Sequence, residues 1–162
     1  MNSMNHERYM AEALVEAQAA FDKGEVPVGA VIVVGDKIVA RSSNSPINNL
    51  DPTAHAEVLA IRQACAALGN YRLPQSSTLY VTVEPCTMCW GAMVHARIGQ
   101  VVYGASEPKA GVLHSHSLNA LEIYNHQPSI VRGVRASECS RLMTDFFEWR
   151  RAAKRRLKRR AS

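Results

Sequence analysis

Two short groups of residues carry most of the potential chemistry in this chain. Cys86-Thr87-Met88-Cys89 follows Pro85, and His55-Ala56-Glu57 follows Asp51-Pro52. Two cysteines at positions i and i+3 lie on one face of a helix, so both sulfurs can bind a single metal ion. A helix N-terminus also favours the thiolate form that metal binding requires. Alone, the cysteine pair is ambiguous, since it also fits half of a structural zinc site or a redox pair.

Together the two groups offer three zinc ligands, His55, Cys86 and Cys89. A structural zinc site completes its tetrahedron with four protein ligands, whereas a catalytic site leaves one position for water. Neither remaining cysteine suits a fourth position, because Cys65 lies on the apolar stripe of a predicted helix and Cys139 has no partner at ligand spacing. We therefore predict one catalytic zinc ion (Zn2+) per chain.

Glu57 is the candidate for moving protons beside this metal. On a regular helix, a residue two positions after His55 would point elsewhere. The glutamate side chain is long, however, and from the first turn it can reach a water molecule at the metal. The alternative is a solvent-facing glutamate that the helix N-terminus favours. The combination with three ligands predicts a catalytic role.

The basic residues of the chain are unevenly distributed. The 162 residues carry a net charge of +5, yet eight basic residues and no acidic one lie between Arg150 and Arg160. The rest of the chain holds 11 basic and 14 acidic residues. Such a basic segment favours a polyanion, with nucleic acid as the obvious partner. The alternative is a solvated helix end whose cations lie near its negative pole.

Length and composition predict a single globular domain over residues 1–162. The longest apolar run, Val28 to Val34, is too short to span a bilayer and indicates no membrane segment. The N-terminus lacks the charged and apolar regions of a secretory signal, so the expected location is cytoplasmic. The four cysteines are accordingly expected to be thiols or metal ligands.

The apolar pattern predicts an α/β fold, one mixed sheet with helices on both faces. Helices are expected at residues 7–22, from Asp51-Pro52 to about residue 68, at 86–96, and from a Ser137 cap onward. Strands are expected at 26–34, 38–41, 78–83, 100–105 and 130–135, with loops at 42–50 and 106–127, the latter with one helical turn near residue 120. Strands joined through a helix should be parallel, and the first pair should form a hairpin.

Two helices are expected to turn particular side chains toward the core. In the second helix these are Val58, Ile61, Cys65 and Leu68, and in the last they are Leu142, Met143, Phe146, Phe147 and Trp149. The candidate ligands begin two different helices. A shared site requires both helix starts to lie at one edge of the sheet, where ligands bind in open α/β sheets.

The residues His55-Ala56-Glu57 and Glu84-Pro85-Cys86-x-x-Cys89 match the H-x-E…P-C-x-x-C pattern of the zinc deaminases. From residue 5 to about 155 the chain resembles the bacterial tRNA-specific adenosine deaminases, which convert the wobble adenosine of an anticodon to inosine. Further residues that carry the resemblance are Val26-Pro27-Val28-Gly29-Ala30-Val31, Asn44-x-Pro46-Ile47, Gly91-Ala92-Met93, Arg97-Ile98 and Asp145-Phe146-Phe147.

This resemblance implies a cytidine-deaminase-like, three-layer α/β/α fold with a five-stranded mixed sheet. It also implies a zinc-dependent hydrolase that acts as a homodimer on a tRNA anticodon stem-loop. The substrate contacts that it implies are Asn44 and the Ala56 amide for the flipped base, Glu107 and Lys109 beside the anticodon loop, and Phe147, Arg150 and Arg151 from the last helix. Trp90, Ser45 and residues 112–124 depart from the family pattern, and His114 and His116 gain no role from it. Trp90 could serve at a dimer interface.

Three other functions remain open from the sequence. A free-base enzyme such as guanine deaminase shares Asp51-Pro52-Thr53-Ala54-His55-Ala56-Glu57, although it has no need of the basic segment. A non-catalytic RNA-binding module would require a fourth zinc ligand or the loss of Glu57. A metal-free redox protein would use only Cys86 and Cys89.

Overall fold

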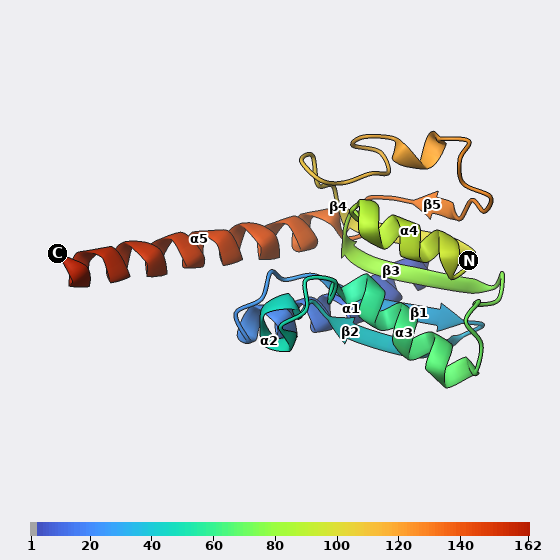
Figure 1. Ribbon diagram of the computed structural model, residues 1–162, viewed down its shortest axis with the longest axis horizontal. Helices are drawn as coiled ribbons and strands as arrows, with labels where there is room; N and C mark the ends of the chain where they lie inside the picture. The colour runs from blue at the N-terminus through green and yellow to red at the C-terminus, as the bar shows by residue number, and fades with distance from the viewer. Residues whose placement is uncertain (1–2) are drawn as a thin grey trace.

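The computed structural model describes residues 3–162 and contains a five-stranded sheet in the order β2-β1-β3-β4-β5 (Figure 1). The strands are β1 (Gly29–Val34), β2 (Lys37–Ser43), β3 (Ser77–Val83), β4 (Gln100–Ala105) and β5 (Ser129–Val131). The helices are α1 (Ser3–Asp22), α2 (Pro46–Asn49), α3 (Ala56–Leu68), α4 (Thr87–His95), the 3-10 turn η1 (Leu118–Ala120) and α5 (Ala136–Ala161). The sheet is mixed, as predicted.

The strand directions place the starts of α3 and α4 at one edge of the sheet. β1 is antiparallel to both β2 and β3, whereas β3, β4 and β5 are parallel. β2 and β3, which α3 connects, therefore run the same way, so the prediction of parallel strands across a helix is confirmed. Because α3 follows β2 and α4 follows β3, both helices start near the carboxyl ends of these strands.

Helices cover both faces of the sheet, which confirms the three-layer α/β/α architecture (Figure 1). On one face, α3 and α4 pack against sheet residues that include Ile32, Leu79 and Val101. On the other face, α1 and the start of α5 pack against residues that include Val31 and Tyr80. β1 therefore lies between two layers of side chains, and five of its six residues are buried.

Two helices begin later than predicted. α3 starts at Ala56 because the Asp51 side chain closes a local turn through two hydrogen bonds of 2.7 and 2.8 Å. α4 starts at Thr87. His55 and Cys86 are the residues just before each first turn, and both have extended backbones, with φ/ψ of −70°/150° and −83°/176°. The directions of their side chains are therefore not set by the 3.6-residue period of the helices that follow.

The predicted core face of α3 is only partly correct. Val58 and Ile61 are buried, but Cys65 is half-buried and Leu68, at the end of the helix, is 41% exposed. Alanines form much of the buried face instead, namely Ala56, Ala60 and Ala64. Their small side chains allow the helix to lie close to the sheet, a feature that a search for large apolar residues overlooks.

The end of the sheet and the start of α5 also differ from the prediction. β5 stops at Val131 because Gly133 and Arg135 adopt left-handed backbones, with φ of 79° and 51°. These two residues turn the chain into α5, which begins at Ala136 and has Arg135, not Ser137, before its first turn. The predicted Ser137 cap is therefore wrong.

The prediction that the apolar side chains of the last helix face the core is mostly wrong. Phe146 is fully buried, but Phe147 and Trp149 are 38% and 47% exposed, and the other two residues are half-buried. α5 packs on the body through its first half and then projects well beyond it (Figure 1). The stripe thus continues past the end of the core. No helix within residues 3–162 is long and apolar enough to cross a membrane.

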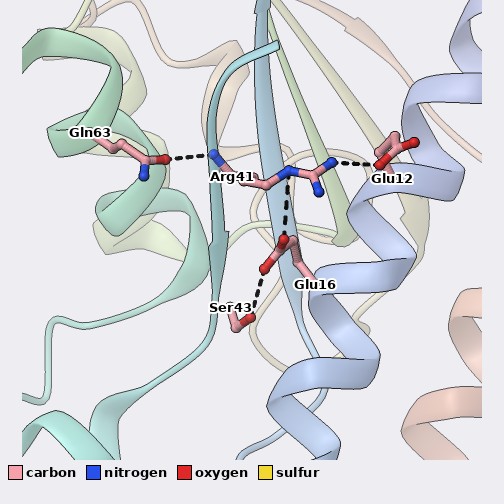
Figure 2. A network of polar contacts seen from close by, with 5 residues as sticks. All are labelled: Glu12, Glu16, Arg41, Ser43 and Gln63. Atoms are coloured by element: carbon pink, nitrogen blue, oxygen red, sulfur yellow. Dashed lines mark hydrogen bonds and ion pairs between the residues drawn. The ribbon is translucent and has the colours of Figure 1, made fainter. Parts of the chain in front are cut away.

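The edge strand β2 is held from both faces of the sheet (Figure 2). From α1, Glu12 and Glu16 pair with the Arg41 guanidinium, and Glu16 also accepts a hydrogen bond of 2.9 Å from the Ser43 hydroxyl. From α3, the Gln63 side chain accepts a 2.6 Å hydrogen bond from the Arg41 backbone N–H. These contacts occupy part of an exposed strand edge. They also position the segment that follows Ser43.

That segment contains a feature the sequence did not predict, the short helix α2 within the expected loop 42–50. The Glu25 carboxylate, 1% exposed, accepts hydrogen bonds of 3.2 and 2.8 Å from the backbone N–H groups of Ile47 and Asn48. A carboxylate at a helix N-terminus satisfies N–H groups that would otherwise lack partners. The second long loop, residues 106–127, is irregular as predicted and contains η1.

Candidate active site

His55, Cys86 and Cys89 meet where α3 and α4 begin. The Nδ1 atom of His55 lies 3.6 Å from Cys86 Sγ and 3.4 Å from Cys89 Sγ. Within residues 3–162, these three side chains form the group of metal-binding type whose ligand atoms all lie within 4.8 Å of one another. Neither Cys65 nor Cys139 belongs to that group, so the structure offers three ligands.

The spacing of these atoms fits a tetrahedral metal ion. Zinc–sulfur and zinc–nitrogen bonds of about 2.3 and 2.1 Å at tetrahedral angles place nitrogen and sulfur about 3.6 Å apart. The two observed distances, 3.4 and 3.6 Å, agree with that value. One nitrogen and two thiolates are also the donor types that zinc prefers. The three residues can therefore hold a zinc-sized ion without rearrangement.

The chain itself prepares one of the two sulfurs as a thiolate. A hydrogen bond from the Cys89 thiol, and a further one with His55, lower the pKa of Cys86 to about 4 in spite of its burial. The same bond and burial raise the pKa of Cys89, while the contact with Cys86 raises that of His55. Metal binding therefore competes with protons at Cys89 and His55, which makes the affinity pH-dependent.

Glu57 lies beside these ligands and is 4% exposed. Because His55 precedes α3 in extended conformation, the two side chains share a cavity although they are only two residues apart. The Glu57 carboxylate also hydrogen-bonds with Cys89. Burial raises the pKa of Glu57 above its ordinary value of 4.5. A raised pKa brings a carboxylate closer to the range in which it both accepts and donates protons near neutrality.

A cavity of about 310 Å³ lies beside this group of side chains. His55, Glu57 and Cys86 line it, and the remaining lining residues are Val26, Val28, Asn44, Pro46, Val83, Glu84, Glu107 and Met143. The lining combines apolar side chains with a few polar groups, as is usual for a pocket that binds a flat heterocycle. The cavity is large enough for a single nucleobase.

Two of the residues predicted for substrate binding lie close to Glu57. Asn44 is 8% exposed and donates a 3.2 Å hydrogen bond from Nδ2 to the Val26 carbonyl, which orients its amide in the cavity wall. Ala56 is fully buried in the first turn of α3, where the preceding His55 forms no side-chain cap. Its backbone amide thus belongs to an uncapped helix N-terminus, which favours electronegative groups.

The other predicted contacts border two neighbouring hollows. Glu107 lines both the cavity and a second hollow of about 280 Å³, which Phe147 and Arg151 also line. Lys109 lines a third hollow of about 460 Å³ that borders Cys86 from the other side. Arg150 is exposed on α5 and lines neither of them. Of the seven predicted substrate residues, Asn44 and Glu107 thus line the cavity, Ala56 directly follows His55, and Lys109, Phe147 and Arg151 line adjoining hollows.

Glu84 is a residue of this region to which the sequence gave no role beyond its place in the family motif. It lies between β3 and Pro85, is 3% exposed, and accepts hydrogen bonds from Glu107, Leu113 and Ser115. These bonds lower its pKa although burial alone would raise it. The available signal was a charged residue at the end of an otherwise buried strand.

Three residues without a role in the sequence analysis have structural partners. Tyr103 Oη lies 2.6 Å from His114 Nδ1, and His116 Nε2 lies 2.8 Å from the Pro108 carbonyl oxygen. Trp90 is fully buried and packs edge-on against Tyr124. The suggestion that Trp90 lies at a dimer interface is therefore wrong, because its side chain is inside the subunit.

A model of the MafB19-like deaminases matches residues 4–151. The chain belongs to this deaminase family. Membership of this family identifies the protein as an enzyme, a hydrolase. It favours this reading over the non-catalytic RNA-binding module and the metal-free redox protein that the sequence left open. The three ligands and the buried glutamate agree with that assignment.

Individual relatives indicate which deaminases this chain resembles. The tRNA-specific adenosine deaminase of Bacillus subtilis strain 168 is 48% identical over 143 residues, 87% of this chain and 88% of the relative. A solved structure from work on A-to-I editing by tRNA:A34 deaminases at the wobble position superposes with a TM-score of 0.81 and 44% identity, over 83% of this deaminase and 98% of that chain. Guanine deaminase from Bacillus subtilis gives a TM-score of 0.60 at 44% identity, over 65% and 66% of the two chains.

Proposed function

We propose that this deaminase converts adenosine to inosine at the wobble position of a tRNA anticodon, with one zinc ion per subunit. The observation that carries the proposal is that the buried Glu57 shares a cavity with the ligands His55 and Cys86, whose ligand atoms lie within 4.8 Å of that of Cys89. The tRNA:A34 deaminase structure covers more of this chain than guanine deaminase does, and with a higher TM-score.

Zinc held by His55, Cys86 and Cys89 would supply hydroxide near neutral pH, by lowering the pKa of a bound water to about 7. Glu57 would accept the proton that the attacking water loses and deliver it to N1 of adenine, which makes C6 electrophilic. As the water oxygen bonds to C6, Glu57 would take the remaining proton of that oxygen and carry it to the exocyclic amine, so that the C–N bond breaks and ammonia leaves. Water is consumed, and inosine and ammonia are the products.

The other cavity residues hold the base during these proton transfers. With Nδ2 of Asn44 bound to the Val26 carbonyl, Oδ1 is available to accept a hydrogen bond from the base edge, since it has no other partner in the described part of the chain. The amide of Ala56 is in position to donate to the same base. Burial of Glu57 keeps bulk water from competing for its protons.

A nucleotide must leave its base stack to enter so small a cavity, and unpaired loop RNA needs least energy for this. We infer that the hollows next to the cavity receive the flanking RNA. Glu107 and Lys109 would contact it from the loop after β4, and Phe147, Arg150 and Arg151 from α5.

The projecting end of α5 extends this proposed RNA surface. Six further cations lie between residues 154 and 160, all exposed: Lys154, Arg155, Arg156, Lys158, Arg159 and Arg160. Three pairs of like charges four residues apart destabilise the bare helix by about 0.2–0.5 kcal/mol each. Phosphate groups would relieve this repulsion and release counterions.

We also propose that the active enzyme is a homodimer, as the family resemblance implies. Partly exposed apolar side chains on the α3 side, Leu68 and Tyr71, support an association through that surface. Sedimentation at micromolar concentration measures this directly, and a subunit mass of 17.8 kDa that persists at all concentrations rejects it.

The test of the proposed function compares three substrates with the zinc-loaded protein: an anticodon stem-loop with adenosine at the wobble position, free guanine and cytidine. The expected result is a one-dalton mass gain of the stem-loop, confined to the wobble nucleotide, with release of ammonia. A matched stem-loop with guanosine at that position serves as the control. Deamination of free guanine with an unchanged stem-loop would replace this proposal by the free-base one.

A further inference from the structure

The loop after β4 has almost no regular secondary structure, yet it carries Glu107 in the wall of the cavity and Lys109 in the wall of the third hollow, beside Cys86. Its only secondary structure is η1, which begins nine residues after Lys109. Something other than a helix or strand must therefore hold residues 107–115 in place. The contacts of one buried side chain, Glu84, answer this question.

Both carboxylate oxygens of Glu84 are used to hold this loop. Oε1 accepts hydrogen bonds from the Glu107 N–H at 3.1 Å and from the Ser115 hydroxyl at 2.6 Å. Oε2 accepts from the N–H groups of Leu113 at 2.9 Å and Ser115 at 3.0 Å. All four donors belong to residues 107–115, so a single side chain connects both ends of this segment to the end of β3.

The loop backbone is shaped around this carboxylate. A Cβ at Gly111 would lie 2.4 Å from the Glu84 carboxyl carbon and 2.6 Å from the Glu107 carbonyl oxygen, so only glycine fits. The Val112 N–H donates a 3.1 Å hydrogen bond to the Pro85 carbonyl, and the Lys109 N–H bonds to the Glu107 side chain at 3.0 Å. The part of the loop that borders the cavity is therefore held against Glu84 and Pro85, the two residues between β3 and Cys86.

We propose that Glu84 is a positioning residue that holds residues 107–115 in their RNA-binding arrangement before the substrate arrives. The inference rests on the proposed function, because it assigns the loop to the RNA. Although Glu84 lines part of the cavity, both of its carboxylate oxygens are bound to residues 107–115, so it acts through Glu107 and Lys109. A preordered loop loses less conformational entropy on binding, so Glu84 strengthens RNA binding and leaves the proton transfers to Glu57.

The chemistry of a carboxylate suits this task. It is an acceptor with two oxygens, whereas the amide of glutamine offers one acceptor oxygen and an NH₂ group that faces other donors. Glu84→Gln keeps the shape of the side chain but leaves two of the four loop donors without an acceptor. Glu122→Gln is the matched control, because Glu122 is exposed in the same segment.

The experiment measures zinc content, KM and kcat on the anticodon stem-loop, and amide exchange of residues 107–117 without RNA. For Glu84→Gln we expect faster amide exchange and a KM raised on the order of tenfold, with kcat within a factor of about three and zinc retained. Glu122→Gln should behave like the wild type. Ser115→Ala removes one of the four bonds, so it should change KM in the same direction by less, and it serves if Glu84→Gln does not fold.

A double-mutant cycle with Lys109→Ala tests whether Glu84 acts through the loop. Lys109→Ala should raise KM less in the Glu84→Gln background than alone, because the lysine is then no longer held in place. Additive effects, a fall in kcat that matches the rise in KM, or unchanged amide exchange would each overturn the proposal. If the wild type deaminates no stem-loop, the proposed function fails, whereas amide exchange still reports whether Glu84 holds the loop.

Discussion

The zinc-ligand group and the projecting end of α5 were both identified from residue types, yet they are built in opposite ways. His55, Cys86 and Glu57 lie in a cavity at the start of two helices, and the ligand atoms are spaced within a few tenths of an ångström of a tetrahedral site. Residues 154–160 lie on a helix that projects from the body, and the six cations among them are all exposed (Figure 1). The first region depends on geometry, the second on charge alone.

This difference predicts which measurement each region controls. A change in the cavity should alter the rate of the chemical step or the retention of zinc, because few atoms can replace a side chain of fixed position. A change on the projecting helix should alter affinity and its salt dependence, because any nearby cation can neutralise a phosphate.

Glu57→Ala should lower turnover by at least about 10³-fold, because it removes the group that carries both protons. Zinc content should remain close to one per subunit, since Glu57 is not one of the three ligands. Metal analysis and single-turnover kinetics on the stem-loop check the two statements. Full activity of this variant would end the proposed role.

Cys86→Ser should weaken zinc binding by more than the roughly 10–100-fold loss typical of an outer-shell partner. Cys65→Ser is the control, because Cys65 is half-buried on α3 and lies outside the ligand group. Dialysis against a chelator, followed by metal analysis, separates the two variants. Equal zinc retention in both would mean that Cys86 is not a ligand.

Replacing the six cations at 154–160 by glutamine should weaken stem-loop binding and lower the salt slope of log Kd by about 0.7–0.9 for each phosphate that the helix no longer neutralises. The rate at saturating RNA should not change, and stability should stay within about 0.5 kcal/mol, because these side chains are solvated on the helix surface. Lys37→Gln with Arg72→Gln, both exposed on the body, provides the control. An unchanged salt slope would mean that the projecting helix is solvated and does not contact the RNA.

The smallest effect is expected for Glu25, and it concerns the pH dependence of the unfolding free energy. Hydrogen bonds from Asn48 and Ile47 outweigh its burial and hold its pKa below the ordinary value of 4.5 in the folded chain. The stabilisation is therefore complete above about pH 4.5 and is lost as the pH falls through the lower, folded pKa. Glu25→Gln should flatten the pH dependence of the unfolding free energy in this acid range. An equally steep profile in Glu25→Gln, measured by urea unfolding between about pH 3 and 6, contradicts this prediction.

The sequence anticipated the fold wherever a local pattern had one physical meaning. The apolar run from Val28 to Val34 became the buried strand β1, and the helix expected to end near residue 68 ends at Leu68. It failed where two local rules competed. Asp51-Pro52 has the residues of a helix start, but the Asp51 side chain closed a turn instead, and the helix began at Ala56. The apolar stripe of α5 is real in sequence, although the core ends before the stripe does.

By itself, the sequence determined the chemical types of the site: one imidazole, two thiols and a carboxylate at spacings that suit zinc and proton transfer. Only the tertiary structure decided that these groups meet, because their distance depends on strand directions that local periodicity does not contain. It also decided which loop Glu84 holds, since nothing in the spacing between Glu84 and residues 107–115 indicates that they meet. Side-chain chemistry is local to a residue, whereas proximity arises from how the whole sheet is assembled.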